Sequence, residues 1–216
     1  MAILVAPERT SGVITHKHPR AVVPALLLAD ATRHAPEYRG RFLEQALTTA
    51  AQIYNGTSAW TTDPYLRDVL APITGDVPSY LVKGLDDGTV DILTAAAARL
   101  EQLRPLPPAE FGDPCAGIGE GWESASAVAL ALLVADLATS DDDSPAALVG
   151  PGALAWASTS NGDSDSIACI AGGLIGSAHP EKDYWAAAGL TPTFEPRYAD
   201  EILAAASRLP AGAPAD

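Results

Sequence analysis

The stretch Asn161–Ala178, NGDSDSIACIAGGLIGSA, decides the fold prediction because it joins an acidic helix cap to a helix made of small residues. Asp163 stands at or just before the expected N-cap, and Asp165 and Ser166 fall in the first turn. The helix behind them contains three glycines. Because each glycine costs a helix roughly 1 kcal/mol relative to alanine, their presence indicates tight packing, and we expect a helix over residues 164–178 that other helices approach closely.

The side-chain oxygens of Asp163, Asp165 and Ser166 can converge on one point beyond the end of this helix. Hard cations such as Mg²⁺ and Mn²⁺ favour oxygen ligands of this kind. Asp and Ser are also common as plain helix caps, so the spacing alone leaves both a metal site and a helix cap open. An EF-hand calcium loop does not fit, because no Gly or Glu falls at the required positions.

The rest of the chain also has a helical pattern. Alanine and leucine, both strong helix formers, dominate the composition, and no alternating strand pattern of useful length occurs. We therefore predict an all-α protein that forms a single domain over residues 1–216, with residues 1–10 and 210–216 loosely held. The expected helices span residues 19–34, 39–54, 64–70, 89–103, 122–137, 164–178 and 198–209, with short helical pieces within 71–88 and before Trp156.

Charge excludes one class of partner. The chain has 27 acidic and 13 basic residues and a net charge of −14, so it would repel a nucleic-acid backbone. No apolar run is long enough to cross a membrane, and the first residues lack the basic region of a signal peptide. We expect a cytoplasmic protein that binds neither nucleic acid nor membrane. The excess of arginine over lysine, together with the abundant alanine, suggests a GC-rich bacterial source.

The phrase from Asn161 to Ala178 resembles the C-terminal motif of the ADP-ribosylglycohydrolase family, roughly G-D-x-D-[ST] followed by an Ala/Gly-rich helix. The resemblance implies an all-α orthogonal bundle of many helices. It also implies that Asp163, Asp165 and Ser166 bind metal in a dinuclear Mg²⁺ or Mn²⁺ site, where the two aspartates serve catalysis. Ser166 replaces the commoner Thr and keeps the hydroxyl group.

Three further segments resemble family motifs in the same order along the chain. Residues 14–21, ITHKHPRA, are similar to a T-H-x-x-P segment near the substrate, which implies a substrate role for His16. An isolated histidine at a helix entry can equally be half exposed and structural. Residues 119–122, GEGW, resemble a G-x-G-[WF] segment, which implies that Gly119, Gly121 and Trp122 line the ADP-ribose pocket. Trp185, after Pro180, is similar to a tryptophan that closes the family's domain, with two more residues in between.

The family's second metal motif, T-D-D-T, has no counterpart in the expected order. Leu85-Asp86-Asp87-Gly88-Thr89 and Asp141-Asp142-Asp143 contain paired acids but lie after the His16 segment, and we interpret both as acidic loops. We therefore expect an N-terminally truncated member of the family that supplies half of the metal ligands, with a separate N-terminal fragment or self-association completing the structure.

The resemblance implies a metal-dependent hydrolase that removes ADP-ribose from a modified protein side chain or a related ADP-ribosyl conjugate. Its partners would be ADP-ribose or an ADP-ribosylated protein, and its activity would be impaired if half of the site is missing. A family member that binds or supports other molecules without catalysis is the first alternative. A helical interaction module, with a capped helix at Asp163 and no metal, is the second.

Overall fold

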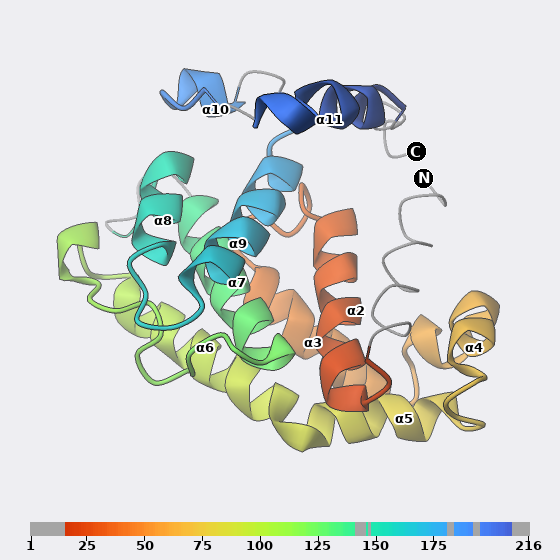
Figure 1. Cartoon of the computed structure of the whole chain (residues 1–216). Helices are drawn as coiled ribbons and strands as arrows, with labels where there is room; N and C mark the ends of the chain where they lie inside the picture. Colours follow the sequence, from red (N-terminus) through yellow and green to blue (C-terminus); the bar gives the residue numbers. More distant parts are fainter. Residues whose placement is uncertain (1–15, 141–145, 147, 181–183, 192–194, 209–216) are drawn as a thin grey trace.

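The protein is built from α-helices, as the composition predicts (Figure 1). The computed structural model describes residues 16–140, 146, 148–180, 184–191 and 195–208, and no strand occurs in these ranges. The predicted loose ends, 1–10 and 210–216, and the acidic run 141–143 lie outside them. The α-helices are α2 (Pro19–Arg33), α3 (Phe42–Tyr54), α4 (Pro64–Leu70), α5 (Val77–Gly84), α6 (Val90–Leu103), α7 (Ser124–Ala138), α8 (Gly150–Ala157), α9 (Ser164–Ala178), α10 (Tyr184–Ala187) and α11 (Pro196–Arg208).

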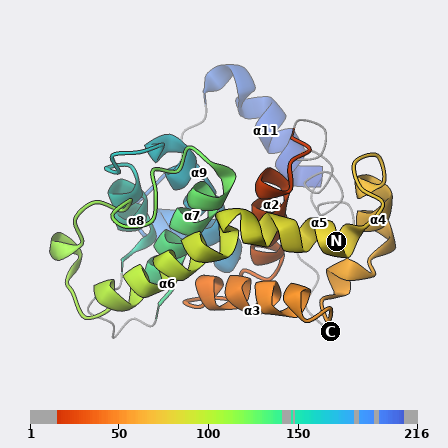
Figure 2. The ribbon, with the colours of Figure 1, turned by 90° about the horizontal axis from the view of Figure 1, so that it is seen from below.

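Helix α7 is the centre of the bundle. It is apolar on every side, and each residue from Ala125 to Leu137 is buried. Helices α2, α3, α6, α8 and α9 all pack against it, and Figure 2 shows α6 crossing α7 with α3 alongside. The sequence predicts this buried helix correctly, but it begins two residues later than expected. Trp122 therefore lies before the helix and is 69% exposed.

A π-helical turn, Leu85–Thr89, joins α5 to α6. The two helices follow one another along a single line beneath the bundle (Figure 1). Gly88 allows this join because its φ of 100° is in the region that favours glycine. Asp87 and Gly88 have non-helical backbone angles, so Asp86 and Asp87 lie at a kink between the two helices. Its cause is a tertiary one: Leu85 and Thr89 are buried and hold the turn against the bundle.

The small residues of α9 allow close contacts, as the sequence predicts. A Cβ atom on Gly172 would lie 3.4 Å from the Leu154 side chain of α8, and one on Gly176 would lie 3.3 Å from the Trp185 indole nitrogen of α10. Trp185 thus covers the end of α9, in keeping with its expected role in closing the domain. Gly173 faces open space, with no atom within 4 Å of such a Cβ, so its presence is not explained by packing.

No helix among the described residues is long and apolar enough to cross a membrane. The central helix, α7, has 15 residues, and its sides are covered by the surrounding helices.

A buried carboxyl group fixes α3 to α7. Asp136 is fully buried, and its two carboxyl oxygens accept hydrogen bonds from the backbone N–H groups of Phe42, at 2.6 Å, and Leu43, at 3.0 Å. Arg41, the N-cap residue of α3, makes no side-chain capping bond. Asp136 therefore supplies from another helix the cap that α3 lacks in its own sequence.

The same burial predicts an unusual pH dependence of stability. Desolvation raises the pKa of Asp136 to about 7, so between about pH 4 and pH 7 the folded protein holds a proton that the unfolded chain has released. As the pH rises through this range, Asp136 should lower the free energy of unfolding by about 4 kcal/mol, at about 1.4 kcal/mol per pKa unit. Urea unfolding of Asp136→Asn should lack this slope, while Asp68→Asn, an exposed control, should retain it. An identical slope in Asp136→Asn would contradict the assignment.

Candidate active site

The acidic motif at the start of α9 packs directly on the glycine loop that precedes α7. The backbone N–H of Asp163 donates to the Glu120 carbonyl oxygen at 2.7 Å. A Cβ atom on Gly162 would lie only 1.9 Å from that same oxygen. Glycine at position 162 is therefore required for this contact, which joins two segments about 40 residues apart in the sequence.

The other two glycines of this contact shape the loop itself. Gly119 has a φ of 131° and Gly121 a φ of 78°, both of which strain other residues. A Cβ atom on Gly121 would approach the Ile167 side chain of α9 to 2.9 Å and Asp163 Cβ to 3.5 Å. Of the two glycines predicted as pocket residues, Gly121 therefore packs against the predicted metal motif, whereas Gly119 packs against Ser126 of α7. Neither glycine lines the cavity described below.

Asp113, which the sequence analysis missed, ties down the loop before α9. Its carboxylate accepts hydrogen bonds from the Asn161 side chain at 2.7 Å and from the Cys115 amide at 3.0 Å. Although desolvation opposes ionisation, these bonds lower the pKa of Asp113. Asp113-Pro114 is a common turn-forming pair, but nothing in the sequence indicates that the turn contacts Asn161.

The acidic motif adopts the expected position on the helix. Asp163 is the N-cap residue of α9, and its side chain makes no capping bond to the helix backbone. It interacts instead with the side chain of Asp165, which is exposed and whose pKa is lowered, chiefly by that hydrogen bond. Ser166 follows in the same turn. The two carboxyl groups therefore lie together at the helix start, as ligands of one cation must.

The chemistry of this donor set fits a hard cation, because every side-chain donor is an oxygen. It is also a partial set. Within the described residues, no group of three or more His, Cys, Asp or Glu side chains could hold a metal ion. Asp163, Asp165 and Ser166 would thus leave further coordination positions to water or to other molecules.

A cavity of about 600 Å³ opens beside the glycine loop, between the starts of α2 and α7. His16 and Trp122, predicted as substrate residues from segments far apart in the sequence, both lie in its wall. The Trp122 indole N–H donates to the Glu120 side chain at 3.2 Å, while the Glu120 backbone carbonyl holds Asp163. One residue therefore links the aromatic wall of the cavity to the acidic motif.

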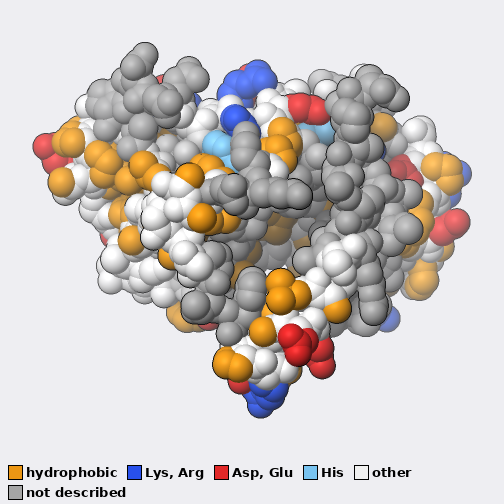
Figure 3. All heavy atoms as spheres, turned by 90° about the horizontal axis from the view of Figure 1, so that it is seen from above, with side chains coloured by type: hydrophobic (Ala, Val, Ile, Leu, Met, Phe, Trp, Pro, Cys, Tyr) orange, Lys and Arg blue, Asp and Glu red, His pale blue; other side chains and the backbone are white. Residues whose placement is uncertain are grey.

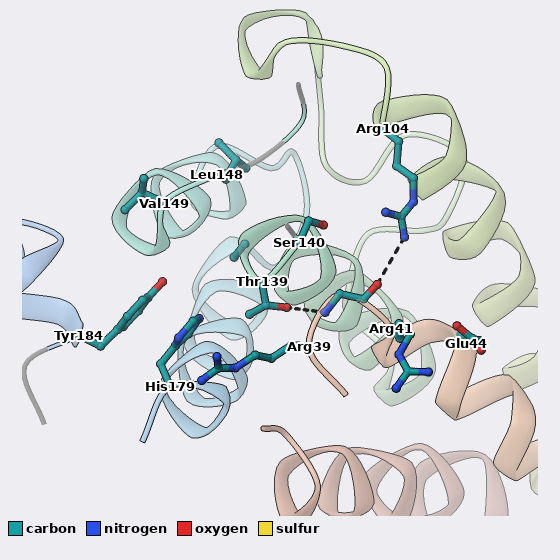
Figure 4. Close-up of a pocket in the computed structure, with 12 residues that line it drawn as sticks. Arg39, Arg41, Glu44, Arg104, Thr139, Ser140, Leu148, Val149, His179 and Tyr184 are labelled. Atoms are coloured by element: carbon teal, nitrogen blue, oxygen red, sulfur yellow. Dashed lines mark hydrogen bonds between the residues drawn. The ribbon is translucent and has the colours of Figure 1, made fainter. Parts of the chain in front are cut away.

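A larger cavity, of about 1030 Å³, lies at the ends of α7 and α9, beside the start of α3 (Figure 4). Its arginines contact backbone carbonyl groups: Arg39 donates to Ala178 at the end of α9, at 2.6 Å, and Arg104 donates to Gly40 at 3.4 Å. Figure 3, which views the molecule from above, shows hydrophobic, basic and histidine side chains scattered across the described part of that face. None of the predicted site residues lies in this cavity.

The helical fold and the acidic motif beside a glycine loop agree with the comparison of the sequence with known families. The family model described as ADP-ribosylglycohydrolase matches residues 4–211. The chain therefore belongs to the ADP-ribosylglycohydrolase family, whose activity is that of a glycoside-cleaving hydrolase. No curated protein and no solved structure matches the chain. The predicted N-terminal truncation stays a prediction.

Two glycine substitutions should separate the site contact from ordinary helix propensity. Gly162→Ala must displace the Glu120 carbonyl and should lower the free energy of unfolding by about 1–3 kcal/mol. Gly173→Ala, which meets open space within α9, should raise it by roughly 0.5–1 kcal/mol. Urea denaturation measures both values. Equal stability of Gly162→Ala and the unchanged protein would show that the loop contact is not tightly packed.

Proposed function

We propose that this protein is a metal-dependent hydrolase that cleaves the N- or O-glycosidic bond between ADP-ribose and a modified protein side chain or related conjugate. The observation that carries the proposal is the packing of Gly121 against Asp163 and Ile167. This packing joins the acidic motif to the loop that leads to Trp122, which lines a cavity together with His16. Family membership supports the same class of reaction.

In this proposal Asp163, Asp165 and Ser166 hold Mg²⁺ or Mn²⁺, two ions by analogy with the family. When bound, the cations supply positive charge that orients the ribose hydroxyl groups and activates water for attack at the anomeric carbon. The chain's own contribution is to hold the two carboxyl groups together at the start of α9.

The substrate residues position the ligand. Trp122 is largely exposed, and its indole N–H donates to Glu120, so its ring offers a flat surface on which a nucleobase or ribose can pack. The bend at Gly121 brings the backbone close to α9. His16 lines the same cavity as Trp122, and an imidazole ring can hydrogen-bond to ribose or phosphate.

Replacing one metal ligand should abolish the reaction. Asp165→Asn should lower the rate of ADP-ribose release by about 100-fold or more, because even outer-sphere partners of a metal are worth 10–100-fold. Asp91→Asn is the matched control, since Asp91 is an exposed acid in the first turn of α6 and should leave the rate unchanged. Release of ADP-ribose from a labelled ADP-ribosylated protein, with Mg²⁺ present, measures the rates. Full activity of Asp165→Asn would rule out the proposed metal site.

Ligand binding should also raise the thermal stability. With Mg²⁺ and ADP-ribose at about 100 times their dissociation constants, the melting temperature should rise by roughly 5–10 °C. Differential scanning calorimetry measures the shift, and Asp165→Asn should lose most of it. A transition that responds to neither ligand would show that the cavity does not bind ADP-ribose under these conditions.

A non-catalytic binding protein is the second candidate function. The observation in its favour is that, among the described residues, only two acids meet at the motif and no larger metal-binding group forms. Such a protein would show the ADP-ribose shift in melting temperature without any release of ADP-ribose. The two experiments above therefore separate the two functions.

A further inference from the structure

An ion pair lies in the wall of the cavity that holds His16 and Trp122. Arg20, in the first turn of α2, pairs with Glu123, the residue immediately before α7. Both side chains line the cavity. The pair joins two segments about 100 residues apart, so it bridges the cavity wall from one helix start to the other.

Both partners of this pair remain accessible to a ligand. The Arg20 side chain is 44% exposed and that of Glu123 is 55% exposed. Ion pairs exposed to this degree contribute little stability, because water screens the attraction. The guanidinium group can therefore exchange Glu123 for a stronger partner at small cost.

Arg20 is also the one arginine or lysine among the described residues that line this cavity. In a chain of net charge −14, an anionic ligand is repelled at long range and needs a local cation to bind. The other basic residues of the wall are two histidines, His16 and His18. His18 is engaged through its Nδ1 atom with the Arg20 amide, as the N-cap of α2.

We propose that Arg20 recognises the diphosphate group of the nucleotide ligand and that Glu123 occupies the guanidinium group when the cavity is empty. This inference rests on the proposed function, because it takes the ligand to be an ADP-ribosyl compound. A guanidinium group matches phosphate oxygens with two parallel hydrogen bonds, which a carboxylate at the edge of the cavity can imitate. Glu123 thus takes the place of the phosphate in the empty cavity. Arg20 determines the specificity for phosphorylated ligands.

The surroundings of the pair support a diphosphate at this point. Trp122 is adjacent to Glu123 and lines the same cavity, so a nucleoside that packs on Trp122 would lie near the ion pair. Helix α7 begins at Ser124 with no side-chain capping bond, and its first N–H groups add favourable charge for an anion.

Calorimetric titration of the full chain with ADP and with adenosine tests the proposal, because neither probe requires hydrolysis. Arg20→Ala should weaken ADP binding by about 10-fold or more, the effect of losing hydrogen bonds to a charged group, and should leave adenosine binding unchanged. Arg20→Lys, which keeps the charge without the paired geometry, should fall between. Glu123→Gln should tighten ADP binding by up to roughly 5-fold, since it removes the competing carboxylate.

Arg33→Ala is the matched control, because Arg33 is an exposed arginine at the other end of α2, and its ADP affinity should not change. Equal losses of ADP and adenosine in Arg20→Ala would overturn the proposal, since they would indicate a general distortion of the cavity. Unchanged or weaker ADP binding in Glu123→Gln, or no ADP binding by the unaltered chain, would also overturn it. Arg20-dependent ADP binding without any release of ADP-ribose would uphold this inference and reject the proposed hydrolysis.

Discussion

The buried carboxyl group of Asp136 is the interaction on which the arrangement of the bundle depends. Helix α7 is otherwise apolar, and an apolar surface specifies burial without specifying rotation or register. Two hydrogen bonds from Asp136 to the start of α3 remove that freedom, because backbone N–H groups inside the protein must find a partner. Thr139, one turn later, accepts from the Gly40 amide at 2.8 Å. The corner between α2 and α3 is thus attached to the end of α7.

This attachment at one end of α7 determines what lies at the other. A helix is stiff, so fixing the position and rotation of its last turn also fixes where its first turn lies. The first turn of α7 is where the ion pair of Glu123 and the bond from Ser124 to the Ala21 carbonyl meet the start of α2. Helix α9 packs along α7, so its acidic start comes to rest on the glycine loop. The candidate site is therefore a consequence of how α7 is held.

The sequence predicts the helices and the acidic cap because both are local. Periodicity and helix-forming residues predict the helices. The order Asp163, Asp165, Ser166 predicts the acidic cap. Family resemblance places the glycines at 119, 121 and 162 near the site. The close packing that requires glycine at 121 and 162 is visible only in the structure. Asp136, Asp113 and Arg20 could not be found, since each acts on a residue remote in sequence. A single aspartate at the end of an apolar run is typical of a helix end that meets water. Asp136 is instead fully buried.

The direction of the helices also distinguishes the two cavities. Helices α2 and α7 begin at the smaller cavity, whereas α7 and α9 end at the larger one. Helix starts carry partial positive charge and favour phosphate, whereas helix ends carry partial negative charge. Arginines of the larger cavity lie at these negative ends. Arg39, for example, donates a hydrogen bond to a carbonyl group at the end of α9. At the smaller cavity Arg20 adds to the field of the helix starts. The positive charge of Arg20 at the smaller cavity therefore coincides with the starts of two helices, whereas arginines of the larger cavity lie at helix ends.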